Sequence, residues 1–213
     1  MVYPPKCAIF ATSNKFIVKK NFLLILFALM STKVQIWAGG IGSLGLEHTF
    51  GTYSYRYHHE RFTSLALTYS KSYSLTSQHP LYLECGASAQ YSFFSKGDDG
   101  RYYLSVKVPV NVVYSIKIHD LSFPFSINPF AGLRWRVNIW GKEYEEYYDD
   151  VFRVNLFNRN ETDWKRMQMG WTVGVKAAFY HRFFVGMSYG SDFTEMAEHM
   201  KVREASLSLG VIF

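Results

Sequence analysis

The sequence is poor in several features that mark common classes of protein. It has two cysteines in 213 residues, which excludes a disulfide-stapled miniprotein and a cysteine-rich zinc fold. Charged residues make up only 19% of the chain, but 18% is aromatic, and so many aromatic residues exclude a disordered chain. The longest apolar run, Phe22–Met30, has nine residues. A helix needs about 20 apolar residues to cross a bilayer, so this run is too short to cross one.

Acidic residues are absent from the first 38 positions, which contain five lysines. Lys19 and Lys20 precede the apolar run 22–30, and small residues follow at 38–40. A charged segment, a short apolar segment and small residues in this order are typical of a secretory signal peptide. We therefore expect residues 1–38 to be a signal peptide and residues 39–213 to be the mature domain. An N-terminal anchor helix is the alternative.

The basic charge of the chain is concentrated in this leader. The formal net charge is +6, but the leader holds five of the 23 basic residues, which leaves 18 against 17 acidic residues. The remaining sequence has no clustered basic face, so we expect no nucleic-acid partner. Cys85 is then the sole cysteine, which excludes an intramolecular disulfide, and no motif indicates a cofactor.

From residue 41 onward apolar and polar residues alternate with a period of two, which predicts β-strands. In the clearest run, Tyr102, Leu104 and Val106 alternate with polar residues as far as position 118. No stretch has a helical period. The runs predict an all-β domain of eight strands, at approximately 42–57, 62–74, 81–94, 101–118, 125–140, 166–180, 182–193 and 204–213. In the first run the apolar phase changes near Gly51, which predicts a β-bulge.

Alternating strands fit a soluble barrel or sandwich, but they also fit an antiparallel up-and-down transmembrane barrel with its apolar face toward lipid. Three features favour the membrane barrel. The tight connection 180–182 and the longer spans 141–165 and 191–203 suggest short turns at one end and long loops at the other. Aromatic residues, among them Tyr102, Tyr103 and Trp164, gather near the strand ends, as in interfacial belts. The polar face carries charges that can pair in a small lumen, and we expect them to form a network: Glu47, Glu84, Lys107, Arg134, Arg136 and Lys176.

The last strand ends on phenylalanine, and alternate positions before it are apolar: Leu207, Leu209, Val211 and Phe213. This pattern resembles the C-terminal β-signal that the barrel-assembly machinery recognises in outer-membrane proteins. Together with the leader and the eight strands, it predicts an integral protein of the cell outer membrane, in contact with the bilayer and the assembly machinery.

Several short segments resemble the PorT-like outer-membrane β-barrel family. They are Pro109-Val-Asn111, Pro129-Phe-Ala-Gly-Leu133, Gly170-Trp171 and Tyr189-Gly-Ser-Asp-Phe193. The resemblance covers essentially all of residues 41–213. It implies a small eight-stranded barrel without a catalytic motif. One named member of that family assists a protein-secretion system, so such a role is one expectation for this chain.

The acidic and aromatic stretch within the span 141–165 is the candidate binding loop: Glu143, Tyr144, Glu145, Glu146, Tyr147, Tyr148, Asp149 and Asp150. Carboxylates suit hard cations, but the spacing does not match a calcium-binding loop, so no metal site is expected. We expect this loop to bind a partner or ligand; a surface loop without a specific role is the alternative.

Histidine offers little evidence of catalysis. Barrel enzymes that act on lipid usually combine a serine with a histidine and an acid. His48 is the only histidine expected at membrane depth, and no serine is evident as its partner. We therefore expect a non-enzymatic protein. A narrow channel for small solutes and, less favoured, a lipid-modifying enzyme are the alternatives.

Overall fold

The computed structural model describes residues 40–55, 59–96, 99–118, 122–147, 150–158 and 162–213. The chain divides into two units, Met1–Ala38 and Gly39–Phe213, and the described residues all belong to the second. The expected signal peptide lies outside the described residues and stays a prediction. Within the described ranges, no helix is long and apolar enough to cross a membrane.

The second unit is a single antiparallel sheet of ten strands. They are β1 (Ile41–Ser54), β2 (His59–Ser74), β3 (Leu81–Lys96), β4 (Asp99–Tyr114), β5 (Ile116–Ile118), β6 (Phe125–Tyr147), β7 (Asp150–Asn155), β8 (Met167–Phe179), β9 (Phe183–Asp192) and β10 (Lys201–Ile212).

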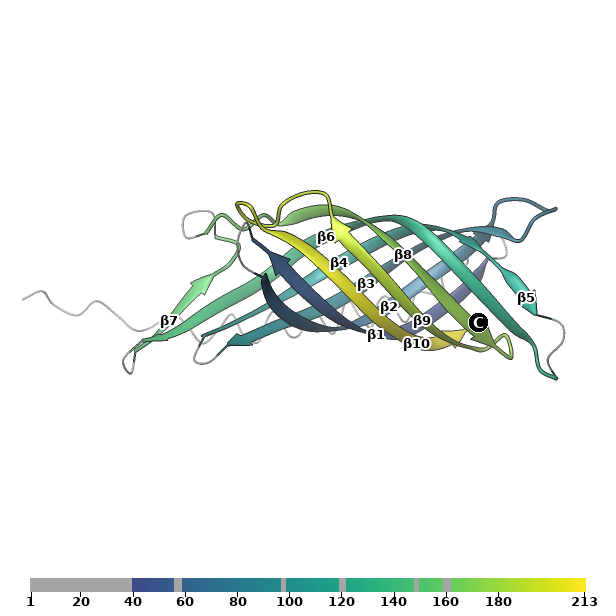
Figure 1. The fold of residues 1–213 in the computed structure, drawn as a ribbon, viewed down its shortest axis with the longest axis horizontal. Coiled ribbons are helices and arrows are strands. Elements are labelled where there is room, and N and C mark those ends of the chain that lie inside the picture. Colours follow the sequence, from purple (N-terminus) through teal and green to yellow (C-terminus); the bar gives the residue numbers. More distant parts are fainter. Residues whose placement is uncertain (1–39, 56–58, 97–98, 119–121, 148–149, 159–161) are drawn as a thin grey trace, which may run out of the picture. The chain divides into compact units, whose positions relative to one another are not determined.

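Pairing between the first and last strands closes the sheet into a barrel. β1 pairs with β10 from Ser43↔Ile212 to Ser54↔Lys201, and β4 pairs with β6. β5 continues the line of β4 past Ser115, and β7 pairs only with β6. Neither β5 nor β7 adds a further strand to the barrel wall, so the expected closed eight-stranded antiparallel barrel is confirmed. Its strands run obliquely side by side (Figure 1).

The two ends of the barrel differ. At the end that we name the turn end, residues 75–80, 119–124 and 180–182 connect the strands, and Phe213 lies there too. At the opposite loop end, β1 and β2 are joined across 55–58 and β3 and β4 across 97–98, so two of the four connections are short. Long connections at the loop end are therefore limited to those that follow β6 and β9.

The predicted bulge at Gly51 is wrong. β1 keeps a continuous register with both neighbours through this position, and Gly51 faces inward. A Cβ there would lie 2.0 Å from the ring of Phe62, so only glycine leaves room for that ring. The apolar phase changes because Tyr53, unlike Leu46 on the outer face, points into an apolar part of the interior.

A β-bulge lies instead in β6. Leu104 pairs with Trp140 and Ser105 with Asn138, which leaves Ile139 as the extra residue. Such an insertion reverses the alternation of the faces. Asn138 is buried before the bulge, and Gly141 is buried after it.

The barrel is apolar outside and charged inside. On the outer face, Leu46 is 59% exposed and Leu209 61%, whereas Arg136 is 1% exposed and Glu204 2% on the inner face. A soluble barrel has the reverse arrangement, so the outer surface is built to face lipid. Exposed and half-buried aromatic residues lie near both rims, as in Tyr102–Trp140 at the loop end and Phe123–Tyr180 at the turn end, each pair 5.3 Å apart between ring centroids.

Candidate functional site

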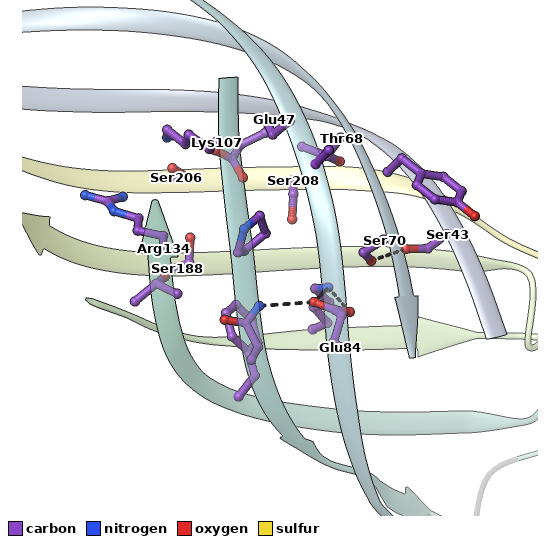
Figure 2. A pocket seen from close by; sticks show the side chains of 18 of the residues that line it. Ser43, Glu47, Thr68, Ser70, Glu84, Lys107, Arg134, Ser188, Ser206 and Ser208 are labelled. Atoms are coloured by element: carbon purple, nitrogen blue, oxygen red, sulfur yellow. Dashed lines mark hydrogen bonds and ion pairs between the residues drawn. The ribbon is translucent and has the colours of Figure 1, made fainter. Parts of the chain in front are cut away.

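The six charged residues predicted for the lumen all lie inside the barrel, as the strand alternation implies. Glu47 is on β1, Glu84 on β3, Lys107 on β4, Arg134 and Arg136 on β6, and Lys176 on β8. Figure 2 shows several of these side chains converging from different strands. They do not form one continuous network but divide into two groups.

The central group is built around Glu204 of β10. Its carboxylate accepts from Lys107 Nζ at 2.7 Å, Arg134 Nη1 at 2.6 Å and Arg136 Nη2 at 2.5 Å. Asp192 of β9 accepts from both arginines at 3.1 Å. Because buried charge is costly unless it is paired, these contacts allow four strands to place charged side chains in the buried interior. Glu47 lies at the edge of the group, 3.7 Å from Lys107.

The second group is a pair nearer the turn end. Lys176 Nζ donates to Glu84 Oε2 at 2.6 Å and to Oε1 at 2.8 Å, and Asn111 donates to Oε1 at 3.2 Å. The ammonium also lies over the rings of Phe130, at 5.3 Å, and Phe184, at 5.7 Å. This pair joins β3 to β8 across the lumen.

Sequence reasoning missed Asp192 and Glu204, the two acids that hold the central group together. The six predicted residues comprise two acids and four bases, whereas the eight observed comprise four of each. A closed lumen should be close to neutral, so the imbalance could have indicated two further inward-facing acids. Each of the two acids lies two positions from a small inward-facing residue on the same strand: Asp192 from Gly190, and Glu204 from Ser206.

Above the charged groups, an apolar cluster closes the loop end; we name it the cap. The inward-facing sides of the strands contribute residues such as Tyr53 and Tyr103 to the cap. The connections that follow β7 and β9 contribute the other residues. Tyr53 and Leu156 are fully buried. The buried members are Tyr53, Phe62, Tyr103, Leu156, Phe157, Met196, Met200 and Val202, with Trp164 packed against them.

The sequence suggested that Tyr103 and Trp164 belong to an interfacial belt, but they do not. Both side chains belong to the cap and lie 6.1 Å apart between ring centroids. A residue near a strand end can belong either to an outward-facing belt or to the inward-facing cap. Position along the strand therefore could not distinguish these two arrangements. What differs is strand parity, since Tyr103 shares the inward face of β4 with Lys107.

Arg101 connects the cap to the candidate binding stretch. Its guanidinium lies 4.9 Å from the ring of Trp164 and 5.6 Å from that of Tyr53. It also forms ion pairs with Glu143 and with Glu60, the latter at 3.4 Å. Glu143 faces inward because of the bulge at Ile139, so this carboxylate holds the barrel wall and is not free to bind a partner.

The rest of the candidate binding loop is not an irregular loop but a β-hairpin. β6 continues to Tyr147 and pairs with β7 from Lys142↔Asn155 to Tyr147↔Asp150. β8 begins only at Met167, opposite Val137, so the hairpin continues β6 past the start of β8 (Figure 1). Tyr148 and Asp149 lie outside the described residues.

The four residues of the C-terminal assembly pattern lie on the outer face of β10. Leu207, Leu209, Val211 and Phe213 are all exposed, and Phe213 exchanges two 2.8 Å backbone hydrogen bonds with Gly42. The last strand therefore pairs with β1 to its end, with its apolar side chains toward lipid.

His48 lies on the lipid-facing side of β1. Its Nε2 is 2.9 Å from Thr63 Oγ1, and that hydroxyl donates to the carbonyl of Thr49 at 3.2 Å. The neighbour is thus a threonine already engaged with the backbone, and no described carboxylate contacts the imidazole. In the described part of the chain, no group of three His, Cys, Asp or Glu residues is arranged to hold a metal ion.

Comparison with known proteins supports the fold. No protein-family model matches the chain, so the PorT-like resemblance is not confirmed, and no curated protein matches it. Among solved structures, Ail, the attachment invasion locus protein of Yersinia pestis, superposes with a TM-score of 0.51 at 12% identity, covering 83% of this chain and all of Ail. Neisserial surface protein A gives a TM-score of 0.48 at 12% identity, covering 82% and 98%, and the outer-membrane enzyme PagL gives 0.45 at 13%, covering 78% and 98%. The chain therefore has the fold of the small eight-stranded outer-membrane barrels.

Proposed function

We propose that this protein is a non-enzymatic, non-conducting barrel of the outer membrane that uses the β6–β7 hairpin to bind a partner outside the cell. The observation that carries the proposal is the combination of a closed lumen and a projecting hairpin. The cap and the two ion-paired groups obstruct the lumen, so solute passage has no evident route. The hairpin extends beyond the barrel wall, so a partner can reach it without entering the lumen.

The composition of the hairpin indicates the chemistry of the partner. Between Glu145 and Asp150 the sequence has four acidic residues and two tyrosines. Glu143 is not counted, because Arg101 neutralises it. An acidic, tyrosine-containing sequence favours a partner with a basic surface, since complementary charge accelerates encounter and selects among partners.

The proposal is tested by affinity capture from intact cells with the triple variant Glu145→Gln, Glu146→Gln and Asp150→Asn. The matched control is the double variant Glu195→Gln and Glu198→Gln, which removes carboxylates from the connection between β9 and β10. We expect the hairpin variant to lose a captured protein that the control retains, and we expect higher salt to weaken capture. Equal capture by both variants at every salt concentration would contradict the proposal.

A secretion-related role is the finer form of this proposal, and it derives from the PorT-like resemblance alone. In that case, deletion of the hairpin should lower the amount of secreted protein in the culture medium while barrel abundance stays constant. An unchanged secreted fraction would leave partner binding in place but remove the secretion role.

Lipid modification is the second candidate, and the contact between His48 and Thr63 is the observation that favours it. A nucleophilic hydroxyl needs a base that is itself oriented, usually by an acid. Since no described acid orients His48, we expect His48→Ala to leave the composition of the outer-membrane lipids unchanged in mass spectrometry. Loss of a lipid species in that variant would instead establish an enzyme.

A further inference from the structure

Basic side chains gather on the outer face of the barrel near the loop end. Arg61 of β2 and Arg203 of β10 both pair with Thr52 of β1, so they lie on either side of it. The next row toward the loop end, around Ser54, also has one base from β2 and one from β10. We name the four bases the basic patch: His59, Arg61, Lys201 and Arg203.

The side chains of the patch point away from the lumen. All four are exposed, whereas the residues that alternate with them in the strands, among them Phe62 and Val202, are buried in the cap. The sequence indicated no clustered basic face, because the patch draws on β2 and on the last strand, β10, which reaches β1 only when the barrel closes.

The strands that carry the patch have no acid on their outer face. β1, β2 and β10 contain one acidic residue each, and all three face inward: Glu47, Glu60 and Glu204. Glu60 pairs with Arg101, and the other two pair with Lys107. In the described part of the chain, no carboxylate forms an ion pair with any base of the patch.

The connections next to the patch do not neutralise it either. The sequence of 55–58, between β1 and β2, is Tyr-Arg-Tyr-His and contains no acid. The connection between β9 and β10 contains two acids, Glu195 and Glu198. It folds over the lumen and not over the outer face, because Met196 and Met200 are buried in the cap. The outer face at the patch is therefore positively charged.

The patch lies at the edge of the apolar band of the barrel. On the outer face, Phe50, Leu65 and Leu207 are 55%, 59% and 53% exposed. On each of the three strands, a base or a hydroxyl follows these side chains within the next two outward-facing positions. The apolar band of a membrane barrel ends where the lipid headgroups begin, so the patch lies at headgroup level.

The spacing of the two arginines suits a phosphate group. The Cα atoms of Arg61 and Arg203 are two strand spacings apart, about 10 Å. Both side chains can therefore reach one group between them, and a guanidinium donates two parallel hydrogen bonds to phosphate oxygens. The hydroxyl of Thr52 lies between the arginines and is a third donor. Long cationic side chains at the edge of an apolar surface reach headgroups in this way.

We propose that the basic patch binds the phosphate group of an outer-leaflet lipid. Arg61 and Arg203 hold the phosphate from both sides of Thr52, and the acyl chains pack on Phe50 and its apolar neighbours below. Three strands separate β1 from β6 in either direction around the barrel. The site is thus on the opposite wall from the β6–β7 hairpin and does not depend on the function proposed above.

The test uses the full mature barrel in an uncharged detergent and native mass spectrometry, which counts the lipid molecules that remain bound. The probe is diphosphoryl lipid A, and the matched probe is the same lipid after removal of both phosphates. We expect the phosphorylated form to bind about tenfold or more tightly than the dephosphorylated form. Equal retention of the two forms would overturn the proposal, because packing of the acyl chains alone would then hold the lipid.

A second measurement separates a lipid headgroup from a free anion. Equimolar inorganic phosphate should not displace the bound lipid A, since it has no acyl chains to pack on Phe50, Leu65 and Leu207. Displacement by inorganic phosphate would assign the patch to a soluble anion and overturn the lipid proposal.

Two double variants locate the site. Arg61→Gln with Arg203→Gln should weaken binding of lipid A about ten- to thirtyfold, the effect of two charges near an anionic headgroup. The matched control, Lys117→Gln with Lys165→Gln, removes two exposed cations elsewhere and should leave binding unchanged. Heat-modifiable gel migration verifies that both barrels fold. Equal weakening in the two double variants, or no weakening in the arginine variant, would refute the site.

Discussion

Glu204 shows how much one residue can contribute inside a membrane barrel. Three cationic side chains, from β4 and β6, converge on its carboxylate. Replacing both partners of a buried ion pair with apolar residues can be neutral, but removing one partner leaves unpaired charge and costs about 3–5 kcal/mol. The central group is therefore more sensitive to the loss of Glu204 than to the loss of any one of its bases.

Glu204→Gln should lower the free energy of unfolding by about 3–5 kcal/mol, because Arg134 and Arg136 then share Asp192 alone and Lys107 keeps only Glu47, 3.7 Å away. Urea titration in lipid vesicles, followed by tryptophan fluorescence, measures the change. The exposed Glu198→Gln serves as control and should change stability by no more than about 0.5 kcal/mol. Similar midpoints for the two variants would show that the lumen charges are solvated and not paired.

The Glu84–Lys176 pair allows a stricter test, since each residue has mainly the other as its charged partner. Glu84→Leu and Lys176→Met should each destabilise the barrel, and the double variant should be more stable than the sum of the two changes implies, with a coupling of about 0.5–3 kcal/mol. The same urea titration provides all four free energies of the double-mutant cycle. Strict additivity would mean that the contact contributes nothing.

At the scale of the element, the sequence predicts strands well and their inner surroundings poorly. The period-two alternation identified all eight barrel strands. Each strand has two chemically distinct faces, because one face meets lipid and the other meets the charged interior. The alternation does not distinguish the inner face from the outer face where both are apolar. For this reason Tyr53 led to the wrong prediction of a bulge, and Tyr103 was wrongly predicted to lie in a belt. Neither the cap nor the continuation of β6 into a hairpin has a local signal, because each depends on contacts between residues distant in the chain.

The C-terminal strand carries a prediction of its own. Phe213→Ser should reduce the amount of folded barrel in cells severalfold, because the assembly pattern of β10 loses its terminal aromatic residue. The same variant should refold from urea into vesicles nearly as well as the wild type, since Phe213 is 69% exposed and its backbone hydrogen bonds to Gly42 remain.

Heat-modifiable gel migration measures both yields. Ser122→Ala, at the same end of the barrel, is the control. A refolding defect as large as the cellular one would assign Phe213 to stability rather than to recognition.

At the scale of the whole molecule, the barrel is a closed cylinder with an apolar exterior. Eight strands leave room for side chains or one small ligand, not for an aqueous channel. The described interior contains a cap at the loop end, charged groups below it and a cavity of about 600 Å³ at the turn end.

Purified barrel in a planar bilayer should show no discrete conductance steps, because the cap and the paired charges obstruct the lumen. A larger porin measured in the same bilayers verifies that single-channel steps are resolved. Reproducible steps from the present protein, in preparations free of porin, would show that the lumen opens and would restore the channel alternative.

The distribution of lumen charge along the chain also has a consequence for the order of folding. The four inner bases are on β4, β6 and β8, whereas Asp192 and Glu204 are on β9 and β10, the last strands to be synthesised. Within the two lumen groups, a partly assembled sheet without those two strands has two acids for four bases, so the unpaired bases need water as their partner. Arrival of the last hairpin supplies the missing counter-charge, so the step that closes the cylinder is also the step that pairs its buried bases.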